Sequence, residues 1–277
     1  MDQTMKYLFI LLSACLLSAC GKSPSLTLHV FECGQVNVHD ISLFSPGVNE
    51  GEAKELTGSC YLIQQPKGKM IWDTGLPDAL AGNQADAFGG KLTLSVNNTL
   101  SDQLAAINVK PEDIKYMGIS HFHGDHTGNA NLFKHSQLFI QQAEYDAAFG
   151  ETPEKFGFNP ASYNALDTSK MTILKGDHDV FADGSVIIKT APGHTPGHQM
   201  LLVNLENEGP IMLSGDLYHF TSNREHRRVP AFNFDKPQTL KTMEMIETFV
   251  KDSGAQFWIQ HDKEQNALIR HSPSFYN

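Results

Sequence analysis

The sequence is poor in several features, and each shortage excludes a class of protein. Basic residues are outnumbered, with 21 Lys and Arg against 31 Asp and Glu and a formal net charge of −10. No extended basic run is present, so nucleic acid and anionic lipid headgroups are not expected as partners. The sequence also lacks solenoid-length repeats, low-complexity tracts and an apolar run of the about 20 residues that span a membrane. The sequence as a whole has the composition of a globular protein, with 40% hydrophobic residues.

Cysteine is scarce, and two of the four cysteines lie in an apolar N-terminal segment. Lys6 precedes the run "YLFILLSACLLSA", whose length is typical of the hydrophobic region of a secretory signal. The run ends in "LSAC", which resembles the lipobox of bacterial lipoproteins with Cys20 as the lipidated residue. An earlier copy, ending at Cys15, would leave a shorter hydrophobic region. We therefore expect residues 1–20 to be a lipoprotein signal peptide; an ordinary cleaved signal or an uncleaved anchor is the alternative.

The expected folded domain, residues 21–277, contains no linker-like segment, and its length suffices for one layered α/β core. A lipid anchor at Cys20 would make the protein exported and membrane-attached, and Gly21 at the second mature position favours an outer-membrane or periplasmic location. Cys33 and Cys60 would remain after processing. They could pair in an oxidising compartment, or they could be two buried thiols on neighbouring strands.

Hydrophobic patterns predict an alternation of strands and helices. Ser25–Val38 is strand-like, and Gly58–Gly75 predicts a hairpin that turns at Pro66–Gly68. The Gly-, Asn- and Asp-rich stretch Leu76–Asn98 predicts a long loop, of the kind that forms lids or binding surfaces. Further elements are expected at Ser101–Ile107 (helix), Ile114–Ser120 (strand), Leu138–Phe149 (strand, then helix), Met171–Tyr218 (strands and turns), Thr239–Lys251 (amphipathic helix) and in a last strand ending at His261. This order predicts an α/β layered sandwich with a site along one sheet edge.

The stretch "SHFHGDHTGN" carries the strongest chemical signal, because three histidines and an aspartate lie within six residues after a predicted strand. His121 and His123 would project from the same side of an extended segment, and the turn at Gly124 would let Asp125 and His126 face a second position. Imidazole and carboxylate groups in this density are typical ligands of zinc, manganese, cobalt or iron. Three later strand ends offer further ligands, namely His194 in "PGHTPGHQ", Asp216 in "SGDLY" and His261 in "HDKEQ".

This ligand order resembles that of the metallo-β-lactamase superfamily, from about Leu26 to the C-terminus. Together, "DTG", "SHFHGDHTGN", "PGHTPGHQMLLV", "SGDLY" and "HDKEQ" most resemble the N-acyl-homoserine lactonase family. The resemblance implies a four-layer αββα sandwich formed by a single hydrolase domain at 21–277. It also implies a hydrolase that opens the lactone ring of N-acyl-homoserine lactones, which is quorum quenching.

The resemblance further implies two divalent metal ions, with zinc favoured over cobalt, manganese or iron. One ion would be bound by His121, His123 and His194, the other by Asp125, His126 and His261, and Asp216 would bridge the two. A hydroxide held by both ions would attack the lactone carbonyl, and Asp125 would carry the proton to the leaving alkoxide.

One position departs from the lactonase pattern. The family places a tyrosine three residues after the bridging aspartate, where its hydroxyl supports the substrate carbonyl. Here that position holds His219, and Tyr218 comes one residue earlier. Neighbouring side chains of an extended segment point opposite ways. His219 is therefore the favoured donor, and local bending that brings in Tyr218 is the alternative.

Other residues have both a functional and a structural interpretation. His198 and Asp73 are expected behind the ligands, with Asp73 orienting a ligand imidazole or merely closing a turn. The basic cluster Asn223–Pro230 could contact substrate or pair with nearby acids. A second long loop is predicted at Gly150–Leu166. The aromatic residues in or near this loop and the loop Leu76–Asn98 could line an acyl-chain groove or pack in the core: Phe88, Phe149, Phe156, Phe158 and Tyr163.

Two other functions compete with the lactonase. The first is a related hydrolase that acts on other esters, lactones or phosphotriesters. A β-lactamase of the best-known zinc class is not expected, because those enzymes have a cysteine at the position that Asp216 occupies here, and no cysteine follows Cys60. A non-enzymatic lipoprotein would be expected to have lost ligands, and all the ligand positions are filled. Acyl-chain preference, native metal and oligomeric state do not follow from the sequence.

Overall fold

Two mixed β-sheets pack face to face in the computed structural model, which describes residues 26–277; the expected signal peptide and Cys20 lie outside this range. The larger sheet has the order β4-β5-β1-β2-β3-β6-β7-β8 and the smaller β13-β12-β11-β10-β9. The larger sheet contains β1 (Thr27–Val38), β2 (Lys54–Gln65), β3 (Gly68–Trp72), β4 (Gln84–Ala87), β5 (Leu92–Ser95), β6 (Ile114–Gly118), β7 (Gln137–Gln141) and β8 (Met171–Leu174). The smaller contains β9 (His178–Asp179), β10 (Val186–Thr190), β11 (Gln199–Leu205), β12 (Gly209–Leu213) and β13 (Gln256–Trp258).

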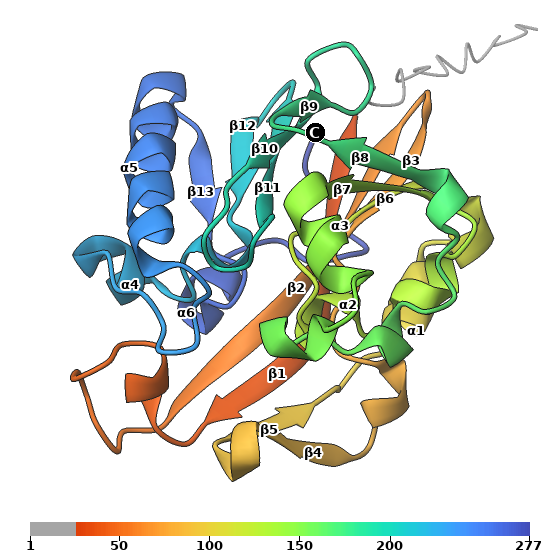
Figure 1. Cartoon of the computed structure of the whole chain (residues 1–277). Coiled ribbons are helices and arrows are strands. Elements are labelled where there is room, and N and C mark those ends of the chain that lie inside the picture. The colour runs from red at the N-terminus through yellow and green to blue at the C-terminus, as the bar shows by residue number, and fades with distance from the viewer. Residues whose placement is uncertain (1–25) are drawn as a thin grey trace, which may run out of the picture.

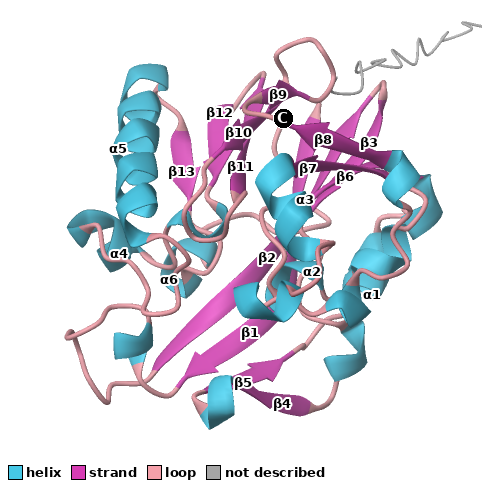
Figure 2. Ribbon diagram, in the orientation of Figure 1, coloured by secondary structure: helices cyan, strands magenta, loops and turns pink. Residues whose placement is uncertain are grey.

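Helices cover the outer face of each sheet, which gives four layers (Figures 1 and 2). The larger sheet is covered by α1 (Leu100–Ala106), α2 (Gly124–Thr127) and α3 (Gln142–Ala148), and the smaller mainly by α5 (Lys236–Ser253). Two short helices, α4 (Thr221–His226) and α6 (Lys263–Asn266), complete the fold. The predicted αββα sandwich is thus confirmed.

Alternation along the strands explains the layering. On β11, Leu201 and Val203 enter the cluster between the two sheets, whereas Met200 and Leu202 pack beneath α5. A third cluster fills the space between the larger sheet and its helices, where Phe31 of β1 takes part. The central strands of both sheets are therefore buried on both faces, as expected for sheets inside a layered α/β protein, whereas the edge strands β4 and β9 contain no buried residue.

Parallel pairing brings several strand ends to one edge. β3 pairs in parallel with β6, and β12 pairs in parallel with β13. The carboxyl ends of these strands lead directly into Asp73, the stretch at His121, Asp216 and His261. Residues that lie far apart in the sequence thereby meet along one edge, as the sequence predicted.

The stretch Leu76–Asn98 differs from the expected loop. It contains β4 and β5, an antiparallel hairpin whose second strand pairs with β1 and widens the larger sheet. Its strands are short and interrupted by Gly, Asn and Asp, which is why the pattern looked irregular. The hairpin turn is formed by Phe88, Gly89 and Gly90, all with positive φ.

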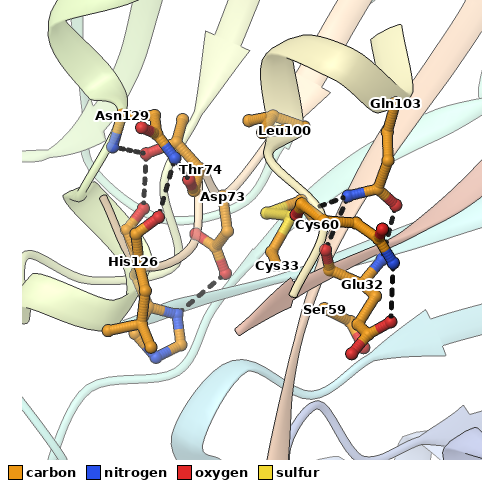
Figure 3. Close-up of a disulfide and its surroundings, with 12 residues drawn as sticks. Glu32, Cys33, Ser59, Cys60, Asp73, Thr74, Leu100, Gln103, His126 and Asn129 are labelled. Carbon is orange, nitrogen blue, oxygen red and sulfur yellow. Dashed lines mark hydrogen bonds and ion pairs between the residues drawn. A yellow bond between two sulfur atoms is a disulfide. The ribbon is translucent and has the colours of Figure 1, made fainter. Parts of the chain in front are cut away.

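Cys33 and Cys60 form a disulfide between β1 and β2, so of the two interpretations of this pair the disulfide is found (Figure 3). Both residues are buried in the cluster beneath the helices of the larger sheet. The neighbouring loop after β3 contacts the bridge, because the amide of Leu76 donates to the carbonyl of Cys33 at 2.9 Å. Within residues 26–277, none of the helices has the length and apolar character needed to span a bilayer.

Candidate metal centre

Four loops supply a compact cluster of imidazole and carboxylate groups. The loop after β6 brings His121 and His123, and His123 precedes the short helix α2 that carries Asp125 and His126. The loops after β10, β12 and β13 add the three remaining candidates, His194, Asp216 and His261. Ligand atoms fall into two groups, each with all its atoms within 4.8 Å of one another: His121, His123, His194 and Asp216 in one, and Asp125, His126 and His261 in the other. The structure thus brings together the residues that the family resemblance implied for each ion, and it places Asp216, the implied bridge, with the first group.

In the first group, three ring nitrogens face one another. His123 Nδ1 lies 2.9 Å from His121 Nε2 and 3.2 Å from His194 Nε2. The Oδ2 atom of Asp216 lies 3.6 Å from His121 Nε2 and 3.3 Å from His194 Nε2. We call the space between these atoms position one.

In the second group, His126 Nε2 and His261 Nε2 lie 3.3 Å apart. The other oxygen of Asp216, Oδ1, lies 3.2 Å from the first of these nitrogens and 3.0 Å from the second. Asp125 Oδ2 lies 3.8 Å from each of them. This is position two, and Asp216 stands between the two positions with one oxygen directed to each.

Contacts on the outer side of each ring determine which nitrogen is free. His123 Nε2 lies 3.1 Å from the carbonyl of Phe156, and His194 Nδ1 lies 3.1 Å from Oδ1 of Asn233. A carbonyl oxygen only accepts, so each of these nitrogens is the N–H donor and the opposite nitrogen carries a lone pair. Those two lone pairs face each other across 3.2 Å. They would repel one another unless a cation lay between them.

At position two, a carboxylate orients a ligand ring through a direct contact. Asp73 Oδ2 lies 3.0 Å from His126 Nδ1, and Asp73 Oδ1 accepts from the amide of Ser120 at 2.6 Å. The amide group of Gln260 also donates to Asp73 Oδ2, at 2.8 Å. His261 is held separately, since its Nδ1 donates to the carbonyl of Thr57 at 2.7 Å. Figure 3 shows Asp73 directed at His126, the orienting contact that the sequence suggested.

The electrostatics of the two positions differ. Burial lowers the pKa of His121 and His194 well below the usual value, and it lowers the pKa of His123. Burial acts in the same direction on His126 and His261, but neighbouring carboxylates, Asp216 foremost, outweigh it and raise both pKa values. Burial would raise the pKa of Asp216, yet the surrounding imidazoles hold it well below the usual value.

The donor set fits two divalent cations. Imidazole nitrogens and carboxylate oxygens are the ligands that zinc and similar ions prefer, and each position offers at least three. Asp216 Oδ1 is buried and has no hydrogen-bond partner of good geometry among the described residues. An oxygen in this situation is well suited to ligation. Asp125, at 29% side-chain exposure, is accessible to solvent, and His123 is the other member that is only partly buried.

The structure separates the two candidates for carbonyl support. His219 Nε2 lies 3.0 Å from Asp216 Oδ2, and its ring stacks on that of His261 with centroids 5.6 Å apart. Tyr218 packs in the cluster beneath α5, with its ring 5.9 Å from that of Phe257. The local bend that would bring Tyr218 to the metal centre is not found, so the prediction of Tyr218 as a catalytic residue loses its geometric basis.

His198 holds the loop of the bridging residue. Its Nδ1 donates to the carbonyl of Ala191 at 3.0 Å, and its Nε2 accepts from the amide of Asp216 at 2.9 Å. Gly215 has φ +48° and a Cβ there would lie 2.5 Å from His198 Nε2, so a side chain is excluded at this point. His198 is thus a structural residue behind the cluster, as expected.

The remaining candidates divide between site and core. Phe149 and Tyr163 pack with the core beneath α3. Phe158 lies 5.7 Å from the ring of His123, and Phe156 contacts the exposed Phe234 at 5.7 Å. Arg224 of the basic cluster forms a bidentate pair with Glu247 at 2.8 and 2.9 Å, so it pairs with a nearby acid.

The sequence interpretation missed several residues around the centre. Phe232 lies between Phe88 and Phe44, at 5.3 Å from each, and 6.0 Å from the ring of His194. Asn233 contacts His194, and Gln260 contacts Asp73. In the sequence, Asn233 lies between two phenylalanines and Gln260 directly precedes His261, and these placements were usable signals. Glu144 in α3 had no such signal, because its partners lie far away in the sequence.

Comparison with known proteins agrees with this geometry. Residues 53–251 match the metallo-beta-lactamase superfamily. The chain belongs to this superfamily. The N-acyl homoserine lactonase AttM of Rhizobium radiobacter is 28% identical over 264 residues, which cover 91% of this chain and 98% of that protein. An N-acyl homoserine lactonase from a Bacillus species is 29% identical over 243 residues, covering 85% of this chain and 93% of the relative.

Solved structures of the superfamily show the same likeness. An N-acyl homoserine lactone hydrolase with its product N-hexanoyl-L-homoserine bound at the catalytic metal centre superposes with a TM-score of 0.79. It is 26% identical, and the superposition covers 90% of this chain and 98% of that one. The expected superfamily and its lactonase-like relatives are therefore confirmed.

Proposed function

We propose that this metallo-beta-lactamase superfamily member hydrolyses the lactone ring of N-acyl-homoserine lactones and so quenches quorum signals. The observation that carries the proposal is the pair of adjoining ligand groups joined by both oxygens of Asp216. Support comes from the similarity to N-acyl homoserine lactonases over most of their length.

Two divalent ions fit the two positions, with zinc favoured by the histidine-rich donor set and cobalt, manganese or iron as alternatives. Position one would use His121, His123 and His194, position two Asp125, His126 and His261, and Asp216 would serve both. Ions bound there would lower the pKa of water and polarise the carbonyl of an ester or lactone.

The chain's own polar groups would then orient substrate and move the proton. The ring of His219 lies at the Oδ2 side of Asp216 and can donate an N–H to the lactone carbonyl oxygen. Asp125 lies on the more exposed side, within 3.8 Å of the two imidazoles of position two. In that place it can take a proton from attacking water and return it to the departing ring oxygen.

Aromatic side chains beside the centre suit an acyl chain. Phe44 and Phe232 contact the ring of His219 at 4.8 and 6.0 Å, on the side of the hairpin turn that carries Phe88. Phe234, 56% exposed, forms a second group with Phe156 near His123. Apolar surface next to a polar reacting centre is typical of a site that binds an amphipathic small molecule.

The test uses purified residues 21–277 loaded in turn with zinc, cobalt and manganese. Acid release from short- and long-chain acyl-homoserine lactones is followed, and Asp216→Ala is the control. We expect fast release that falls by about 10³-fold or more in the variant, because loss of metal-based charge stabilisation costs several kcal/mol. Two bound ions without lactone hydrolysis would contradict the lactonase and move the search to aryl esters, thioesters and phosphotriesters.

We also propose that the protein is exported and lipid-anchored at Cys20, in the outer membrane or on the periplasmic side. The lipobox-like "LSAC" motif supports this location. The Cys33–Cys60 disulfide supports it as well, since such bonds persist mainly in oxidising compartments. Mass spectrometry of the protein extracted from membranes would test it, and a soluble chain that retains residues 1–20 would contradict it.

A further inference from the structure

One buried carboxylate near the metal centre touches no imidazole. Glu144 lies in the first turn of α3 and is 1% exposed. Its Oε1 accepts from the amide of Phe122 at 3.0 Å, and its Oε2 accepts from the amide of Gly197 at 2.8 Å. The hydroxyl of Thr195 lies 3.0 and 2.8 Å from the two oxygens.

These partners belong to the two loops that form position one. Phe122 stands between His121 and His123, so its amide fixes the backbone that carries two of the ligands. Thr195 and Gly197 follow His194 closely in the loop between β10 and β11. Glu144 therefore joins a loop of the larger sheet to a loop of the smaller sheet at the point where their ligands meet.

The close approach is built into the loop. A Cβ at Gly197 would lie 2.4 Å from the backbone nitrogen of Glu144 and 2.7 Å from its Cβ. Only glycine lets this loop reach the first turn of α3. The buried carboxylate receives all three donors on acceptor-only oxygens, an arrangement that matches a carboxylate and not an amide.

Position two has no such link. His126 and His261 are held by Asp73 and by the carbonyl of Thr57, and neither of these groups contacts Glu144. An effect on one metal position alone is therefore expected from the contacts.

We propose that Glu144 is a positioning residue for position one, holding His121, His123 and His194 at the separation that one metal ion requires. The inference rests on the metal centre of the proposed function, but not on the identity of its substrate. Partners that orient metal ligands typically affect metal affinity by about 10- to 100-fold.

The test is metal binding by Glu144→Gln, followed by titration with Co²⁺ and its visible spectrum. A glutamine cannot accept at both ends, since its NH₂ group would face one of the donors. We expect affinity for one of the two ions to fall by about 10- to 100-fold, with a spectrum that matches His194→Ala and not His261→Ala. Glu247→Gln, which breaks a pair with Arg224 away from the centre, should bind both ions normally.

Equal affinity of Glu144→Gln for both ions, with an unchanged spectrum, would overturn the proposal. Equal weakening at both positions would overturn it too, because it would indicate general loosening of the fold. Should Glu144→Gln fail to fold, Thr195→Val decides the question, since it removes only the hydroxyl donor and should weaken the same position to a smaller degree. Lactone hydrolysis is not needed for this readout, so failure of the lactonase assignment stays separate.

Discussion

The two metal positions use similar ligands but are prepared in different ways. At position one, burial lowers the pKa of three imidazoles, and Glu144 fixes the loops through their backbone amides. At position two, a carboxylate touches a ligand ring directly, and the nearby acids raise the pKa of both histidines. Position one thus offers imidazole nitrogens that bind protons weakly. Position two, with its nearby carboxylates, attracts any cation, including a proton.

This contrast has a consequence for assembly. Protons compete with an entering ion less strongly at position one, where the histidine pKa values are lowered, than at His126 and His261 of position two, where they are raised. Two ligand sets that share Asp216 can therefore differ in metal affinity, and in the conditions under which each fills. The predictions below change one position or the other.

Among substitutions that leave every proposed metal ligand in place, replacing His219 should give the largest effect on activity. His219→Phe keeps the ring next to Phe44 but removes the N–H beside Asp216 Oδ2. Loss of a donor to developing charge typically lowers kcat by about 100-fold, and we expect a change of that size in kcat/KM. Tyr218→Phe should leave it nearly unchanged, because that ring lies beneath α5. Steady-state kinetics on both variants test this. A larger loss of kcat/KM in Tyr218→Phe than in His219→Phe would show that Tyr218 reaches the substrate.

Asp73→Asn should mainly affect position two. Asn tolerates the positive φ of this residue, which is 56°, so the backbone is preserved. Its NH₂ group would, however, face donors in either orientation: His126 and Gln260 at the place of Oδ2, or the amide of Ser120 at the place of Oδ1. Metal affinity at position two should fall by about 10- to 100-fold, measured by Co²⁺ titration. If Asp73→Asn lost the ion of position one first, the assignment of Glu144 to position one and Asp73 to position two would be refuted.

Lowering the pH should empty position two before position one. The pKa values of His126 and His261 are raised, so protons compete for these nitrogens increasingly as the pH falls. The pKa values of His121 and His194 are lowered, so protons compete less for these rings over the same range. Affinity at position two should therefore drop by about tenfold per pH unit for each proton displaced. Dialysis against buffered zinc from pH 8 to pH 5, with metal counted per chain, measures it; simultaneous loss of both ions would be the contrary result.

Much of this centre was predictable because its signals are local. The three histidines and Asp125 lie within six residues, and His194, Asp216 and His261 each follow a recognisable strand. Parallel strands end at the same edge, which is why candidates so distant in sequence were expected at one site; their division into two ligand sets followed from the family resemblance.

The parts that escaped prediction depend on long-range contacts. Glu144 acts on backbone amides 22 and 53 residues away, and a backbone amide leaves no trace in the sequence. Similarly, His261 donates to the carbonyl of Thr57 across 204 residues. The hairpin of β4 and β5 was missed because its stability comes from pairing with β1, not from its own composition.

Removing the disulfide should have the smallest effect on the difference in metal affinity between the two positions. The bridge joins β1 to β2 behind the loop that carries Asp73, and a Cβ at Gly75 would lie 2.4 Å from that of Cys33. Because the bridge closes a separation of 27 residues, its loss in Cys33→Ala/Cys60→Ala should lower the free energy of unfolding by about 3 to 4 kcal/mol. Denaturant unfolding measures that loss. Affinity for both ions should change by less than about threefold, because Asp73 keeps its partners Ser120, His126 and Gln260. A selective loss at position two would instead show that the bridge, and not only Asp73, determines the orientation of His126.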